Sequence, residues 1–170
     1  MGWDIQSYSI ALLFDMDARE VEGHAEITAA RTTGENFVLH ARGPEILSLQ
    51  VDGEDREWTR SGDELRLGPL EGEEVRVSVS WRALPSEGIG GLQWGADVVF
   101  SFHEPEYARK WLVLYDVPSD KASLSWEITV PEGLTVAANG ELQGVESAGG
   151  ENVWSFVLDG PVPTYLMAVH

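Results

Sequence analysis

Apolar and polar residues alternate along most of this chain with a period of two. Alternating rows cover residues 75–81, 124–130 and 21–27, and a shorter row covers residues 154–158. In each row the residues between the apolar positions are mostly polar or charged. A period of two places the apolar side chains on one face of a strand. The pattern therefore predicts strands that bury one face and expose the other.

Turn-forming residues separate these rows at short intervals. They include the pairs Asp52-Gly53, Asn139-Gly140 and Gly149-Gly150. Asp-Gly and Asn-Gly pairs supply the positive φ angles that tight hairpins need. No stretch of a dozen residues keeps a helical period, and the best candidate for a short helix is 105–110. Many short strands with glycine-rich turns predict an all-β, antiparallel β-sandwich, with two layers because each apolar face needs a cover.

The charge of the chain excludes several classes of partner. Its 170 residues carry 29 acidic and 11 basic side chains, which gives a formal net charge of -18. Such a surface repels phosphate backbones and anionic lipids, so we expect neither nucleic-acid binding nor membrane binding. The length fits a single domain, and no apolar run is long enough to cross a bilayer. Because no basic region followed by an apolar stretch stands at the start, we expect a cytoplasmic protein.

A search for catalytic or metal-binding residues finds only weak candidates. The absence of cysteine excludes thiol nucleophiles, thiolate zinc sites and disulfides. The segment HEPEY at 103–107 looks like the helical HExxH zinc motif, but Pro105 would break the helix that aims the ligands. Glu22, His24 and Glu26 share one strand face, which is more typical of a solvated polar row than of a metal site. We therefore predict no catalytic residue and no metal ligand in this chain.

Of two further candidates for a binding site, the first is excluded and the second depends on the structure. The segment GIGG at 88–91 has neither the preceding strand, the following helix nor the Lys-Ser/Thr pair of a phosphate-binding loop. The chain has seven tryptophans. If three or more of them lined one exposed face, a stand-alone sandwich that binds carbohydrate or protein would be favoured.

The segment after residue 99 resembles a known family. Residues 100–109, FSFHEPEYAR, are similar to a stretch that the aminopeptidase N (alanyl aminopeptidase) family of zinc metallopeptidases writes as TQFEPTDAR. Further similarities follow in order: Asp116, Pro118, Lys121 and Ala122 match a D-x-P-x-x-K-A pattern, followed by TVPEG at 129–133, AANG at 137–140 and PTYLMAV at 163–169. Similar features near the start, at residues 7–10 and 21–23, extend the resemblance over essentially the whole chain.

The resemblance implies a place in a larger protein. The corresponding family domain is a twisted, saddle-like antiparallel β-sandwich at the N-terminus, in agreement with the periodicity. In the family the next domain carries the zinc site and the exopeptidase motif, and this sequence contains neither. We therefore expect residues 1–170 to be the single N-terminal domain of a longer zinc aminopeptidase whose catalytic domain, with its zinc, is absent. An end at His170, inside an apolar strand, fits an excised domain.

The resemblance also implies that one residue of this domain reaches the substrate. The family's glutamate before proline corresponds to Glu104 and projects toward the free α-amine of the peptide N-terminus. The chemistry is suitable, because hydrogen bonds to charged groups contribute about 1.5–3 kcal/mol. Asp116 is expected to anchor its loop rather than to catalyse. Arg109 and Lys110 are expected to pair with nearby acids.

Departures from the family pattern leave two functions open. Residues 112–114, LVL, stand in place of FPC, and Phe102 and His103 replace Gln and Phe. The leading hypothesis is a non-catalytic domain that walls the active-site cleft of a zinc aminopeptidase, has the catalytic domain as its partner and helps bind the substrate's free N-terminus. The alternative is a domain of a catalytically inactive family member that acts as a protein-interaction scaffold. Under either hypothesis, the isolated chain is expected to hydrolyse nothing.

Overall fold

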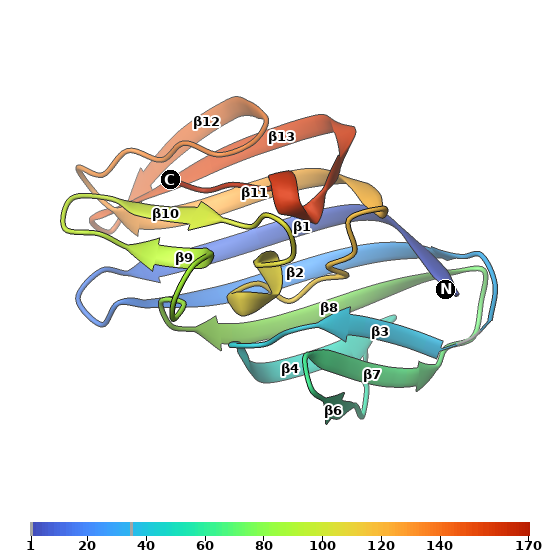
Figure 1. Cartoon of the computed structure of the whole chain (residues 1–170). Helices are drawn as coiled ribbons and strands as arrows, with labels where there is room; N and C mark the ends of the chain where they lie inside the picture. Colours follow the sequence, from blue (N-terminus) through green and yellow to red (C-terminus); the bar gives the residue numbers. More distant parts are fainter. Residues whose placement is uncertain (1, 35) are drawn as a thin grey trace.

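The computed structural model describes residues 2–34 and 36–170, and most of them lie in strands (Figure 1). One large sheet contains β1 (Trp3–Asp15), β2 (Glu20–Arg31), β4 (Glu45–Val51), β5 (Glu54–Asp55), β8 (Glu74–Ala83), β11 (Lys121–Pro131), β12 (Glu141–Ala148) and β13 (Glu151–Pro163). Two smaller sheets contain β3 (Asn36–His40), β6 (Thr59–Ser61), β7 (Glu64–Pro69), β9 (Gly91–Trp94) and β10 (Val99–Phe102). Two single turns of 3-10 helix are η1 (Ala108–Lys110) and η2 (Thr164–Leu166).

The large sheet has the strand order β12-β13-β11-β1-β2-β8-β4-β5. Its neighbouring strands pair antiparallel except for β1 and β11, which run parallel in a register from Ser7 beside Ser123 to Leu13 beside Thr129. The predicted all-β sandwich is confirmed, and this parallel pair is the point at which the sheet is mixed rather than purely antiparallel. The pair joins the first strand of the chain to a strand more than a hundred residues later, across the middle of the sheet.

A second layer covers one face of the large sheet. It consists of the β9–β10 hairpin, the β3-β7-β6 sheet and the connection from β10 to β11, which lie together in front of the large sheet in Figure 1. Aromatic contacts join the layers: the ring of Phe14 in β1 lies 6.2 Å from that of Trp94 and 6.5 Å from that of Trp111. The two layers therefore share one core, as the one-sided strands require.

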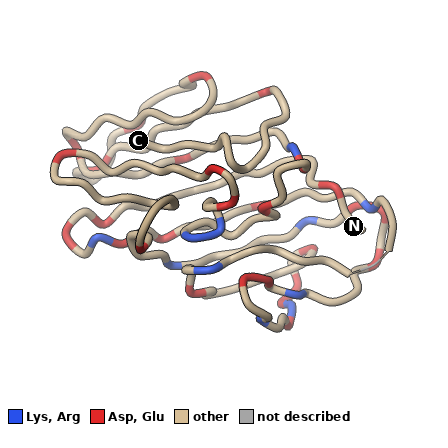
Figure 2. Tube along the Cα trace, in the orientation of Figure 1, with Lys and Arg blue, Asp and Glu red and all other residues tan. Residues whose placement is uncertain are grey.

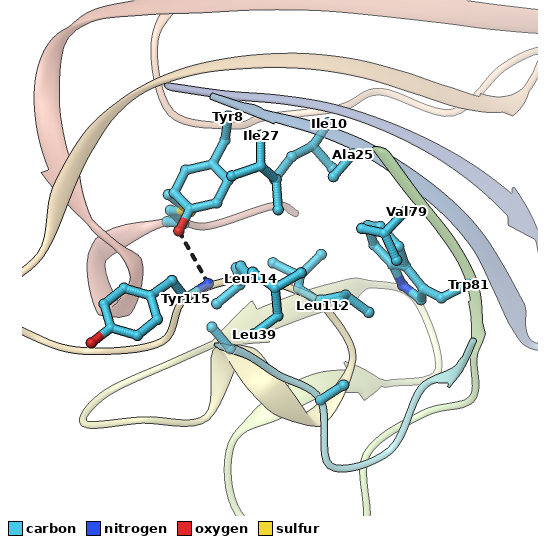
Figure 3. Close-up of a cluster of buried hydrophobic side chains, with 14 of the residues drawn as sticks. Tyr8, Ile10, Ala25, Ile27, Leu39, Val79, Trp81, Leu112, Leu114 and Tyr115 are labelled. Carbon is cyan, nitrogen blue, oxygen red and sulfur yellow. Dashed lines mark hydrogen bonds between the residues drawn. The ribbon is translucent and has the colours of Figure 1, made fainter. Parts of the chain in front are cut away.

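The alternating rows seen in the sequence supply that core. The apolar residues of the rows at 75–81 and 124–130 are all buried, and so are Val21, Ala25 and Ile27. Figure 3 shows side chains of β1, β2 and β8 meeting Leu112 and Leu114 of the covering layer. Both leucines are 0% exposed, so the LVL segment that replaces FPC is a packed part of the core.

Two hydrogen bonds fix the covering layer to the large sheet. The backbone N–H of Tyr115 donates to the hydroxyl oxygen of Tyr8 at 3.1 Å, drawn as the dashed line in Figure 3. The indole Nε1 of Trp81 donates to the carbonyl oxygen of Trp111 at 2.8 Å. Gly23 makes room for this indole, since a Cβ at that position would lie 2.2 Å from the Trp81 ring. The segment 111–115 is thereby held in place from β1 and β8.

The structure also bears on the predicted short helix and on the distribution of charge. The short helix expected at 105–110 is a turn followed by the single turn η1, with Pro105 outside it. Acidic residues are spread over all parts of the trace rather than gathered in one patch (Figure 2). Among the described residues, no helix is both long and apolar enough to span a membrane.

Candidate functional site

Glu104 lies on an exposed turn between β10 and η1. We call residues 102–107 the rim segment. Phe102, Glu104, Pro105 and Glu106 are exposed, whereas His103 is buried. The side chain of Glu104 makes no hydrogen bond or ion pair with any other residue that the structure describes. The predicted substrate-binding carboxylate is therefore open to solvent and unpaired.

The rim segment is fixed to the core from below through His103. The backbone N–H of Tyr107 donates to the carbonyl oxygen of His103 at 2.7 Å, which closes the turn. The indole Nε1 of Trp111 donates to Nε2 of His103, also at 2.7 Å. Burial lowers the pKa of His103 to about 4, so the imidazole is neutral at pH 7. Since Nε2 accepts the indole hydrogen, we infer that the ring proton is on Nδ1. His103 is thus part of the support for the turn.

A buried carboxylate holds the next part of this loop. Asp116 is 0% exposed and accepts hydrogen bonds from Nε of Arg109 at 2.9 Å and from Oγ1 of Thr164 at 2.5 Å. The backbone N–H of Asp116 donates to Nδ1 of His40 at 3.1 Å. These four residues, which we call the anchor cluster, join the loop to β3 and to η2. The prediction that Asp116 anchors the loop is confirmed.

The cations of the anchor region follow two different patterns. Arg109 pairs with Asp116 and also lies 3.5 Å from the carboxylate of Glu106, so its predicted ion pairing is confirmed. Burial and, next, the positive charge of Arg109 lower the pKa of His40. This agrees with a neutral His40 ring that accepts the hydrogen bond from the Asp116 N–H. Lys110 differs from the prediction. Its Nζ donates to the carbonyl oxygens of Glu87 and Ile89 at 2.9 and 2.7 Å instead of pairing with an acid.

The glycine segment at 88–91 therefore has a structural task. Within it, the carbonyl oxygen of Ile89 accepts a hydrogen bond from Nζ of Lys110, which also lies 4.8 Å from the centroid of the Tyr107 ring. Gly90 lies directly against that ring, because a Cβ at position 90 would come within 1.9 Å of it. The glycine segment thus packs against Tyr107 and restricts the end of the rim segment.

The weak metal candidates are occupied by local contacts. His24 contacts Oγ of Ser80 at 2.9 Å through Nδ1 and Glu26 at 3.2 Å through Nε2, as a solvated polar row would. No three His, Cys, Asp or Glu side chains of residues 2–34 and 36–170 gather as a metal site would require. These residues therefore do not fit a zinc ion.

Two other surfaces could compete with the rim as a binding site. A groove of about 360 Å³ lies beside the tip of the β9–β10 hairpin and is lined mainly by apolar side chains, with Asp97 and His170 among its few polar ones. The tryptophans are the other possibility, but Trp3, Trp81, Trp111 and Trp126 are buried and Trp58, Trp94 and Trp154 are half-buried. All seven tryptophans are among the described residues and none is exposed, so a stand-alone sandwich that binds through an exposed tryptophan face is not supported. The rim presents its exposed carboxylate on a turn that a buried hydrogen bond supports.

Comparison with known sequences points to one class of protein. The model of the peptidase M1 N-terminal domain family matches residues 90–166. Probable aminopeptidase 1 of Sulfurisphaera tokodaii is 26% identical over 168 residues, which cover 96% of this chain and 21% of that protein. Leucine aminopeptidase 2 of Aspergillus terreus is 28% identical over 166 residues, 84% of this chain and 26% of that protein. The chain spans between about a fifth and a quarter of the length of these relatives.

Solved structures agree with the sequences. An M1 zinc metallopeptidase mutant from Deinococcus radiodurans, bound to a Tyr-Ser-Ala substrate, matches 99% of this chain with a TM-score of 0.90 and 26% identity, over 42% of its own chain. Aminopeptidase A of Legionella pneumophila in complex with aspartic acid has a TM-score of 0.92 at 18% identity, over 99% of this chain and 21% of its own, which shows the shared fold.

The fold and the rim thus define a β-sandwich domain that has no cluster of potential metal ligands among its described residues and presents a carboxylate at one edge. The predicted resemblance is confirmed: this chain is similar over nearly its whole length to the N-terminal domain of M1 zinc metallopeptidases. The similar proteins above are peptidases, so the inactive-scaffold alternative is not favoured.

Proposed function

We propose that this chain is the non-catalytic N-terminal domain of a longer zinc aminopeptidase, in which it walls the substrate cleft. Within that cleft, Glu104 binds the free α-ammonium group of the peptide. The observation that supports this role is the state of Glu104: an exposed carboxylate without a partner in the described structure, on a turn that the core holds in place.

The anchoring of the turn matters for binding. A carboxylate on a flexible loop would lose conformational entropy when it met its ligand, and that loss would be subtracted from the affinity. Here the Trp111–His103 hydrogen bond, the closed 103–107 turn and the packing of Gly90 against Tyr107 fix the backbone beforehand. Most of the charge-assisted hydrogen bond, about 1.5–3 kcal/mol, is then available to the ligand.

We expect the hydrolytic groups in another domain, because the described residues of this chain hold no cluster of potential metal ligands. A zinc ion would activate the attacking water, and its ligands are expected in the catalytic domain of the parent protein. The contribution of this chain is to select a free N-terminus and to exclude water on one side of the cleft. The predicted cytoplasmic location, and the expected lack of nucleic-acid and membrane partners, stay predictions.

The proposal is tested in the full-length parent protein with the substitution Glu104→Gln, which keeps the shape and removes the charge. We expect kcat/KM for aminoacyl p-nitroanilides to fall by about 10- to 150-fold, the equivalent of 1.5–3 kcal/mol. Glu106→Gln is the matched control, because Glu106 is also exposed but faces Arg109. A Glu104→Gln enzyme as active as the Glu106→Gln enzyme would refute the role of Glu104.

A further inference from the structure

The strand β12 leaves one edge of the large sheet open. It is the outermost strand of that sheet (Figure 1), it pairs with β13 alone among the described strands, and all eight of its residues are exposed. At the opposite edge, β5 contains only two residues. A strand without an outer neighbour presents unpaired backbone N–H and C=O groups, to which another chain can add a strand. Of the two edges of this sheet, β12 therefore offers the longer one.

The face of β12 that continues the core is apolar and only partly covered. Val145 lies beside Trp154 of β13, which in turn lies beside Ile128 of β11. Exposure rises along this row, because Ile128 is 0% exposed, Trp154 is half-buried and Val145 is 42% exposed. Leu142, which is 47% exposed, ends a second such row beside Phe156. The apolar face of the large sheet therefore reaches the β12 edge while still open to solvent.

The opposite face of β12 is acidic. A register shift between Leu142 and Gly144 brings Leu142 and Val145 to the same face of the sheet. Their chain neighbours Glu141 and Glu146 then point to the other face. Residues 122–170 contain six acidic and no basic side chains, and Figure 2 shows no Lys or Arg on β12 or β13. The open edge is thus apolar on one face and negatively charged on the other.

We propose that the β12 edge binds an extended segment of a partner protein as an additional strand of the large sheet. The recognised segment alternates apolar and basic residues. Its apolar side chains lie beside Leu142 and Val145, and its Lys or Arg side chains face Glu141 and Glu146. In this mode of binding, main-chain hydrogen bonds supply affinity and the alternate side chains supply specificity. The inference does not depend on the role of Glu104.

The charge of the edge argues against a second copy of this chain as the occupant. Each copy would bring Glu141 and Glu146 to the shared edge, and two chains with a net charge of -18 repel each other. Acidic side chains on an edge strand keep identical chains from pairing. A basic segment instead gains from the same charges, because cross-strand pairs of opposite sign are favourable. Charge complementarity therefore favours a basic segment.

The first test measures binding of labelled peptides to the 170-residue chain by fluorescence anisotropy. The peptides have the length of β12: one alternates valine and lysine, one has the same composition in two blocks, and one alternates valine and glutamate. We expect the alternating valine–lysine peptide to bind about tenfold more tightly than either of the others. Equal binding of the two valine–lysine peptides would mean unspecific attraction to an acidic protein, and the proposal would fail.

Charge reversal on β12 gives a sharper test. The double variant Glu141→Lys, Glu146→Lys should exchange the preference, so that the valine–glutamate peptide binds about tenfold more tightly than the alternating valine–lysine peptide. Glu127→Lys, Glu132→Lys is the matched control, because these two exposed residues lie in β11 and in the turn after it and change the net charge equally. The control should keep the original preference. Equal changes in both double variants would assign the binding to net charge and contradict a site on β12.

The position of the bound strand is tested by cross-linking, which is clean because the chain has no cysteine. Val145→Cys should form a mixed disulfide with a valine–lysine peptide that carries cysteine in place of a central valine. Val157→Cys is the control, because Val157 is 38% exposed but lies in β13, one strand inside the edge. Equally fast cross-linking of the two variants would refute pairing at β12.

Two further outcomes would identify a different occupant. If the wild-type chain sediments as a dimer at the concentrations of the binding assay, and Val145→Lys makes it monomeric, a second copy covers the edge and the proposal is wrong. If the alternating valine–lysine peptide binds the 170-residue chain but not the full-length parent, another domain of the parent covers the edge, with the same consequence. Monomeric wild-type chain and binding to both proteins are the results that we expect.

Discussion

Two carboxylates in the connection between β10 and β11 behave in opposite ways. Asp116 is fully buried and bonded to Arg109 and Thr164, whereas Glu104 is exposed and unpaired within the described structure. A buried charge is tolerated only with partners, so the environment of Asp116 commits it to holding the loop. An exposed charge on a rigid turn costs the fold little and stays free for a ligand. Within one loop, one acidic residue therefore stabilises the fold and the other stays available to a ligand. The residue types alone do not reveal which acid has which role.

The largest effect expected from this contrast is on stability. Asp116→Ala leaves the Arg109 guanidinium, whose side chain is 11% exposed, without its main partner. We expect the free energy of unfolding to fall by about 3–5 kcal/mol, measured by urea denaturation of the 170-residue domain. Glu106→Ala removes only the exposed partner of Arg109 and should cost less than about 1 kcal/mol. Glu104→Ala should lie within about 0.5 kcal/mol of the wild type. Equal losses of unfolding free energy for Asp116→Ala and Glu104→Ala would contradict the different roles of the two carboxylates.

A second test uses the buried base beneath Glu104. His103 binds a proton at about pH 4 in the fold, against an ordinary pKa of 6.5 in the unfolded chain. The unfolded state therefore takes up the proton first as the pH falls, and the fold loses about 3 kcal/mol between pH 6.5 and 4. His103→Gln keeps a side-chain acceptor for Trp111 and should remove this loss, as judged by unfolding curves at several pH values.

The quantity to compare is the difference in free energy of unfolding between wild type and variant at each pH, because a second group titrates in the same pH range. Burial raises the pKa of Asp120 to about 6, so its protonation stabilises the fold as the pH falls from about 6 toward its ordinary value. That contribution is present in both proteins and cancels in the difference. Identical pH profiles for the two proteins would show that His103 is not held neutral by the core.

The smallest expected effect concerns the packing of the glycine segment against the rim segment. Gly88 and Gly90 both have positive φ, 67° and 78°, so alanine at either position meets the same backbone strain. Only at position 90 would the new Cβ meet the Tyr107 ring, since nothing lies within 4 Å of it at position 88. Gly90→Ala should therefore cost about 1–3 kcal/mol more than Gly88→Ala. The measurement is thermal unfolding of the two variants, and equal midpoints would argue against a packed Tyr107.

Hydrophobic alternation was sufficient to predict the layers of the fold but not their complete pairing. The rows at 75–81 and 124–130 bury the side chains that the period assigned to the core. The parallel pairing of β1 with β11 could not be read from those rows, because a period of two is common to both kinds of pairing. The LVL segment at 112–114 departs from the FPC of the family pattern, yet all three residues are fully buried, because apolar side chains fill this part of the core.

The site was less accessible to sequence reasoning than the fold. Composition could not distinguish Glu104 from the other acids among 29, and only its place in a matching stretch singled it out. The predicted partner of Lys110 is a carboxylate, but its Nζ binds the backbone carbonyl oxygens of Glu87 and Ile89, which no pattern of charges reveals. Phe102 departs from the family pattern. Its contact with the ring of Tyr107 exists only in the folded turn, so the sequence does not reveal it.

The parallel pairing of β1 with β11 also has a consequence for how the polypeptide is made. During synthesis the ribosome releases β1 first, yet the strand that covers one of its edges, from Ser123 to Thr129, emerges more than a hundred residues later. Until then β1 can pair only with β2, and its other edge stays open to neighbouring chains. Contacts so distant in sequence slow folding, so nascent or truncated chains that end before β11 should aggregate and should depend on chaperones.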